Sequence, residues 1–190
     1  MITVSKWVKY AIIADLAKKL QEKGLHLGRT ALQKFIYLLQ ELYNVDCGYE
    51  FKFYTYGPFS SEISGNLEIM TLYDVIKVQP PDCSYGRSAY KIEPSAECEA
   101  LLETASDFLA ENREKIETLL SVFGNKTAEN LELYATVAWV DRSLYSNENK
   151  GCEDIASLVH ELKPKFEMDK IKEGIQFMNN YGFLLSGKAS

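Results

Sequence analysis

The residue types that could catalyse a reaction or bind a metal are few and widely separated in this chain. They are two histidines and four cysteines, namely His26, His160, Cys47, Cys83, Cys98 and Cys152. The cysteines form no C-x-x-C pair, the spacing typical of a zinc site. The sequence also has no nucleophile–histidine–acid set, no Gly-rich phosphate loop and no G-x-S-x-G motif. We therefore expect no catalytic residue, no metal and no cofactor, and hence a protein that is not an enzyme.

Carboxylates are the other chemically active group, and they are concentrated in the second half of the chain. Up to Glu93 there are 11 Lys and Arg against 10 Asp and Glu, whereas from Pro94 onward there are 10 against 17. Their spacing, for example at Glu97, Glu99 and Glu103, is typical of a solvated helix face rather than of an acid–base pair. Because an acidic half repels phosphate, we expect any contact with nucleic acid to lie in the first half.

The composition is that of a globular protein, with 190 residues, 46% hydrophobic and 25% charged. No apolar run is long enough to cross a bilayer, and residues 1–9 lack the apolar core of a signal peptide. Without a secretion signal, the cysteines are interpreted as reduced thiols. These features predict a cytoplasmic protein with no membrane partner.

The elements of the first half follow the order of a winged helix, a helix-turn-helix fold that carries a β-hairpin. Apolar periodicity predicts helices over residues 5–23, from Thr30 onward, and over 60–72. Two short strands, 75–78 and 88–92, are expected to flank a wing loop over residues 80–86. We therefore predict a mainly α (α+β) fold, with a winged-helix-like domain over residues 1–94.

The second half, residues 95–190, is predicted to be an all-helical domain with one long helix over 96–123. Within that helix Leu102, Leu109, Ile116 and Phe123 recur every seven residues, and Asn112 sits at a polar position of the same seam. Two interpretations stay open. The helix is either a spine packed inside its own subunit, or it contributes Leu109, Asn112 and Ile116 to a homodimer seam.

An alternating aromatic segment, residues 49–56, precedes the third helix. Alternation predicts that Tyr49, Phe51 and Phe53 face the core, while Tyr54 and Tyr56 face outward. Outward aromatics at the end of a strand are good anchors for a protein partner. The alternative is that the C-terminal helices cover both tyrosines.

The helix over 60–72 would normally enter the major groove of DNA in a winged helix. Its outward positions carry no Arg, Lys, Gln or His, the residues that read bases or hold phosphates. Contact with duplex DNA would instead depend on cations scattered elsewhere in the first half. The candidate nucleic-acid contacts are Arg29, Lys34, Lys77, Arg87 and Lys91.

Two motifs of the first half are similar to those of a known family. The run L-Q-K-F-I-Y over residues 32–37 and the corner Y-G-P-F-S over 56–60 resemble the YwgA-like family of bacterial and archaeal proteins. Residues 131–139 and 162–164 also look like that family's C-terminal half. A more distant resemblance is to the Panacea or SocA-like domain. The first resemblance implies the fold and little about function, whereas the second implies an antitoxin or protease adaptor that acts through protein contacts.

Two functions stay open from the sequence. The first is a cytoplasmic winged-helix regulator that binds duplex DNA and whose helical half serves for dimerisation or sensing. The second is an antitoxin-like or adaptor-like interaction module that binds a protein without nucleic acid.

Overall fold

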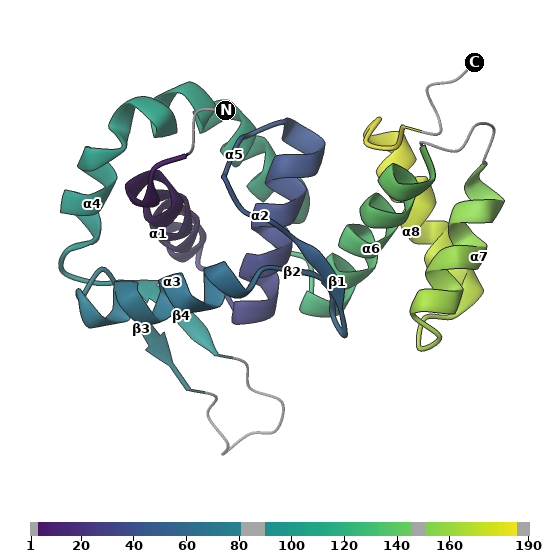
Figure 1. Cartoon of the computed structure of the whole chain (residues 1–190), viewed down its shortest axis with the longest axis horizontal. Coiled ribbons are helices and arrows are strands. Elements are labelled where there is room, and N and C mark those ends of the chain that lie inside the picture. The colour runs from purple at the N-terminus through teal and green to yellow at the C-terminus, as the bar shows by residue number, and fades with distance from the viewer. Residues whose placement is uncertain (1–3, 81–89, 146–150, 186–190) are drawn as a thin grey trace.

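The computed structural model describes residues 4–80, 90–145 and 151–185. Within these ranges the chain is mainly helical, with eight helices and two small antiparallel sheets of two strands each (Figure 1). In chain order the elements are α1 (Lys6–Glu22), α2 (Arg29–Tyr43), β1 (Lys52–Tyr54), β2 (Gly57–Phe59), α3 (Ser61–Leu72), β3 (Ile76–Gln79), β4 (Lys91–Pro94), α4 (Cys98–Thr104), α5 (Ser106–Phe123), α6 (Ala128–Tyr145), α7 (Cys152–Leu162) and α8 (Met168–Asn180). The predicted mainly α, α+β class is confirmed.

Helix α1 is the centre of the first group of elements. The Ser5 hydroxyl accepts a hydrogen bond from the Val8 amide at 3.3 Å and caps the helix N-terminus. Every residue from Tyr10 to Ala17 is buried, because other elements cover more than one side of α1. Helices α3, α4 and α5 surround it together with α2 (Figure 1).

A β-bridge and a hairpin close the lower side of this group. Strands β3 and β4 pair from Ile76 opposite Pro94 to Gln79 opposite Lys91. The Ile92 amide also donates to the Leu27 carbonyl at 2.8 Å, which joins the α1–α2 connection to the hairpin. The resulting order is helix, bridge, helix, β1–β2 hairpin, helix and β3–β4 hairpin. Most of the expected wing loop over residues 80–86, and Arg87 directly after it, lie outside the described residues.

The helix predicted over residues 96–123 is two helices. The backbone leaves the helical region at Ala105, with φ −123° and ψ 23°. The Thr104 hydroxyl donates to the Leu101 carbonyl at 2.6 Å and so satisfies one of the acceptors that the end of α4 exposes. The break changes the direction of the chain, which lets α4 pack on α1 while α5 packs on both α1 and α2.

The chain does not divide in space at Pro94, where the boundary between two domains is predicted. Helices α4 and α5 belong to the group around α1, and their buried residues are part of one continuous core. The other group consists of α6, α7 and α8, which lie beyond α2 (Figure 1). Helix α6 joins the two groups by packing against α2 on one side and against α7 and α8 on the other.

The aromatic segment forms a tight corner between the two groups. Strand β1 pairs with β2 from Lys52 opposite Phe59 to Tyr54 opposite Gly57. The Gly-Pro pair, predicted to end a strand, therefore begins the second strand of a hairpin. Gly57 has φ +81°, a conformation that only glycine adopts readily, and a Cβ there would lie 3.1 Å from the Thr136 hydroxyl on α6.

Substituting two glycines by alanine tests this description of the corner. Gly57→Ala is expected to lower the free energy of unfolding by about 1–3 kcal/mol, since it combines a strained backbone with a close contact. Gly65→Ala is the matched control, because Gly65 lies inside α3 with no atom near the new methyl group. That variant should gain about 0.5–1 kcal/mol. Urea denaturation followed by circular dichroism measures both, and equal effects would contradict the corner geometry.

Candidate functional site

Two glutamine side chains of α2 hold the aromatic segment in place. The Gln33 amide donates to the Ser60 carbonyl and accepts from the Ser60 amide, both at 2.9 Å. The Gln40 amide makes the same pair of bonds with Tyr49, both at 3.1 Å. Since the glutamines are two helical turns apart, they lie on one face of α2. Each glutamine therefore offers one donor and one acceptor to the backbone at one end of residues 49–60, as a neighbouring strand would.

Lys34 supports the corner from the same helix. Its side chain is only 1% exposed, and its ammonium donates to the Pro58 carbonyl at 2.6 Å. Burial lowers the pKa of Lys34 to about 8; Glu132 acts in the opposite direction, and Lys163 adds to the lowering. The polar residues of the L-Q-K motif thus contact the Y-G-P-F-S corner directly.

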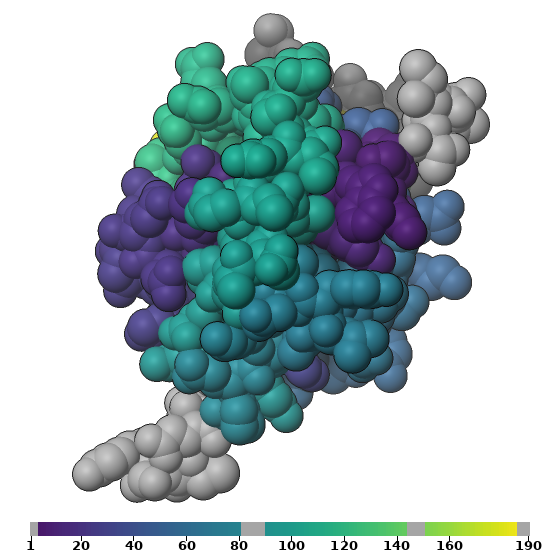
Figure 2. All heavy atoms as spheres, turned by 90° about the vertical axis from the view of Figure 1, so that its left-hand side faces the viewer, coloured from purple at the N-terminus to yellow at the C-terminus, as the bar shows by residue number. Residues whose placement is uncertain are grey.

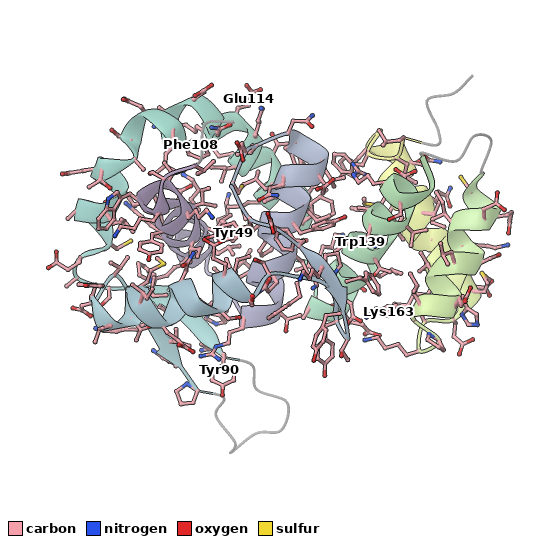
Figure 3. The ribbon with its side chains drawn as sticks, in the orientation of Figure 1. Tyr49, Tyr90, Phe108, Glu114, Trp139 and Lys163 are labelled. Carbon is pink, nitrogen blue, oxygen red and sulfur yellow. The ribbon has the colours of Figure 1, made fainter. Side chains whose placement is uncertain are left out.

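An ion-pair cluster around the buried carboxylate of Glu132 holds the corner from the other side. On α6, Glu132 pairs with Lys163 at 2.9 Å and with Lys165 at 2.7 Å. Lys163 extends from the end of α7 toward the corner (Figure 3), where its ammonium also donates to the Thr55 carbonyl. The same ammonium lies 5.3 Å from the centre of the Phe53 ring. Helix α2 and the segment after α7 therefore hold the hairpin between them.

The turn of this hairpin presents two tyrosines to solvent. Tyr54 is 67% exposed and Tyr56 60% exposed, so the C-terminal helices do not cover them. Beside them is a pocket of about 220 Å³. Its lining includes Arg29, Gln33 and Phe59 in addition to the two tyrosines. We define Tyr54, Tyr56 and this pocket as the hairpin corner site.

The five predicted nucleic-acid contacts are not equally placed. Arg29 is exposed and its guanidinium stacks on the Tyr90 ring at 4.3 Å, next to Lys91 on β4 (Figure 3). Lys77 is exposed on β3, opposite Glu93. Arg87 lies outside the described residues. Lys34 was wrongly predicted to be accessible, because the hairpin and α6 cover that side of α2.

The predicted dimer seam is also covered. Ile116 is fully buried, and Asn112 is buried with its amide donating to the Phe108 carbonyl at 2.9 Å. Leu109 is half-buried against the same core. Because α5 packs on α1 and α2, these three residues serve as a spine within the subunit and form no accessible seam.

Groups with catalytic potential are dispersed in the part of the chain that the structure describes. Cys47 and Cys98 are buried, which raises the pKa of both thiols. The ring Nδ1 of His160 lies 3.0 Å from the Phe166 carbonyl, to which it donates in the corresponding tautomer. Among the described residues no three potential metal ligands gather, and no helix has the length and apolarity needed to span a membrane.

No protein-family model matches this chain, and no curated protein is similar to it. The resemblance to the YwgA-like family and to the Panacea or SocA-like domain therefore stays a prediction. What the structure adds is a physical role for the motif residues that carry it. Gln33 and Lys34 bind the backbone of the corner, which explains why these polar types occur on an apolar helix.

Sequence patterns did not predict two groups of residues that the structure brings together. The buried partners Glu132 and Lys163 are far apart in the chain, and the only sequence signal for them is an acidic residue inside a helix that is apolar nearly all round. A surface formed by Trp7, Leu72 and Tyr73 was also missed, since its residues come from two helices.

The depressed pKa of Lys34 predicts a specific pH dependence. The unfolded chain holds this proton more strongly than the folded one, so stability should rise as the pH increases from about 8 toward about 10. Lys34→Met should lose that rise. The measurement is the urea midpoint between about pH 7.5 and 9.5.

Lys52→Met serves as the control, because Lys52 is exposed on β1. Since Cys47 and Cys98 are present in every variant, their raised pKa affects all the pH curves alike, and the difference between variants isolates Lys34. Wild type and Lys34→Met following parallel pH curves would contradict the prediction.

Proposed function

We propose that this chain is a cytoplasmic, non-enzymatic interaction module built on a winged-helix frame, acting as an antitoxin-like or adaptor-like protein. Its partner is another protein, which it contacts through the hairpin corner site. Three helices followed by the β3–β4 hairpin, with a bridge strand between the first two helices, support the winged-helix frame, to which the β1–β2 hairpin between α2 and α3 is an addition.

The observation that carries this proposal is the pair of exposed tyrosines on a rigid support. Tyrosine brings a large contact area with few rotatable bonds, and it is enriched among the residues that dominate binding energy. The backbone of the corner is fixed by Gln33, Lys34 and Lys163 before any partner arrives. Such preorganisation lowers the entropy cost of association.

The outer face of α3 favours a protein partner over DNA. Its exposed positions are uncharged or acidic, and none of its twelve residues is a cation. Glu62 on this helix pairs with Lys9 at 2.7 Å. The positive charge of Lys9 is therefore neutralised by the helix itself. A helix of this kind repels the phosphates that line a major groove.

Tyrosine substitution tests the hairpin corner. Affinity purification of the full chain from its native cell should recover a stoichiometric protein partner, and Tyr54→Ala or Tyr56→Ala should reduce the recovery by about tenfold or more. The purified pair, titrated by calorimetry, should show the same loss. Because both side chains are exposed, the variants should keep the wild-type melting temperature.

Tyr181→Ala provides the control, since Tyr181 is 51% exposed at the end of α8 and is no part of the corner. Binding that survives both corner substitutions, or a native purification that yields no partner, would contradict the proposal. Light scattering of the purified chain determines whether the partner is a second copy.

A second candidate function is transcriptional regulation through duplex DNA. The observation that favours it is a group of cations at the β3–β4 hairpin. Arg29 and Lys91 flank Tyr90 there, and Lys77 is exposed on the neighbouring strand. A wing that contacts the backbone of DNA would use these cations. The acidic charge of the chain, −6 overall, opposes this function.

Salt-dependent binding tests the DNA function. In this case a labelled duplex should bind at about 50 mM salt, and affinity should fall steeply as salt increases. Lys77→Gln or Arg87→Gln should each weaken binding to all sequences and reduce the salt slope by about one. Lys52→Gln on β1 is the control. Fluorescence anisotropy measures the affinities, and no binding to duplex at low salt would exclude this function.

A further inference from the structure

A second surface lies on the side of the molecule away from the hairpin corner. It is a groove of about 770 Å³ between the start of α1, the end of α3 and α4. Figure 2 looks at this side, with α4 crossing α1 and the end of α3 below. The walls include Trp7 and Tyr10 from α1, Leu72 and Tyr73 from the end of α3, and Leu101 from α4.

The groove is lined by large apolar side chains that remain in contact with water. Leu72 is 82% exposed, Tyr73 67% and Trp7 51%. Ile69, one turn before Leu72 and Tyr73, adds to the same side of α3 and is 41% exposed. Contiguous apolar patches of this kind mark interaction sites, because a partner that covers them removes apolar surface from water.

The walls of the groove are fixed relative to one another. The Ser95 hydroxyl donates to the Asp74 carboxylate at 2.5 Å, and the Glu97 amide donates to the Asp74 carbonyl at 3.0 Å. The Ser95 amide adds a bond to the Val75 carbonyl at 2.9 Å. These contacts tie the end of α3 to the start of α4, so the groove exists without its occupant.

The rim of the groove is acidic. Glu97 lines it, while Glu68 and Glu103 lie one turn from Leu72 and Ala100 on the two facing helices. Among the described residues these three carboxylates have no ion-pair partner. Lys6 is the one cation among the lining residues, and its ammonium lies 4.9 Å from the centre of the Trp7 ring.

We propose that this groove binds an amphipathic helix of another protein, whose apolar face is flanked by Lys or Arg. Helix α4 has seven residues and is therefore about 10 Å long, which matches two turns of a bound helix. The acidic rim selects basic flanks by charge complementarity. A second copy of this chain would place acidic rims against each other, and nucleic acid would be repelled.

This binding goes beyond the function proposed for the hairpin corner, because the two surfaces share no residue. Helical peptides of about 16 residues, displayed on phage and panned against the full chain, test it. The library fixes apolar residues at i, i+3, i+4 and i+7 and varies the flanking positions among Lys, Arg, Glu, Gln and Ser. We expect enrichment of Lys and Arg at the flanks.

An enriched peptide, labelled and titrated by anisotropy, should bind Leu72→Glu at least about tenfold more weakly than wild type. Leu162→Glu is the matched control, since Leu162 also ends a helix, α7, and is exposed. Glu97→Lys should weaken the same peptide, whereas Tyr54→Ala should leave its affinity unchanged. Equal affinities for Tyr54→Ala and wild type would show that the groove acts independently of the hairpin corner.

Three results would overturn the proposal. One is a panning in which no enriched peptide depends on Leu72. Another is enrichment of acidic flanks. The third is a concentration-dependent dimer, seen by sedimentation, that Leu72→Glu abolishes, because a second copy would then occupy the groove. Each result leaves the proposed role of Tyr54 and Tyr56 unaffected.

Discussion

The structure depends on hydrogen bonds to the backbone of a partly buried segment, residues 49–60, that lies mostly outside regular secondary structure. Residues 49–60 cross the surface of α2 and pair with each other only over the short β1–β2 hairpin. Gln33 and Gln40 supply the missing donors and acceptors at the two ends of the segment, and Lys34 supplies a donor at its corner. Together with Lys163, which donates to the Thr55 carbonyl, these side chains fix the position of the segment. The fixed position of residues 49–60 leaves Tyr54 and Tyr56 exposed and provides a surface on which α6 packs.

Helix α6 carries buried charge near both of its ends and apolar residues between them. Near one end Glu132 pairs with Lys163 and Lys165, while near the other Asp141 accepts the Leu185 amide at 2.8 Å. Arg142 extends this contact by donating to the Glu41 carbonyl at the end of α2, at 2.7 Å. Of these contacts, the one that reaches α2 is made by Arg142, whose guanidinium also pairs with the Glu41 carboxylate at 3.2 Å. Separating α6 from α2 would break this charged contact. The two groups of helices are therefore joined by polar contacts as well as by apolar packing.

Local patterns predicted the three helices of the first half and the two strands of the β3–β4 hairpin, because apolar periodicity is a local signal. Local patterns gave wrong predictions where an element packs against neighbours on two sides. The apolar stripe of α2 gives one buried face, yet residues from Leu32 to Leu39 are all buried because the hairpin and α6 cover the other. Lys34 was misplaced for that reason. The break at Ala105 was missed because no Gly or Pro marks it, and the groove was missed because its walls meet only after folding.

The contact between Gly57 and Thr136 has an evolutionary consequence. The turn of the hairpin approaches α6 so closely that a methyl group at position 57 would lie 3.1 Å from the Thr136 oxygen. Lineages that drift toward a larger residue at position 136 lose the room that the turn occupies. The two positions should therefore vary together among descendants, although nearly eighty residues separate them along the chain.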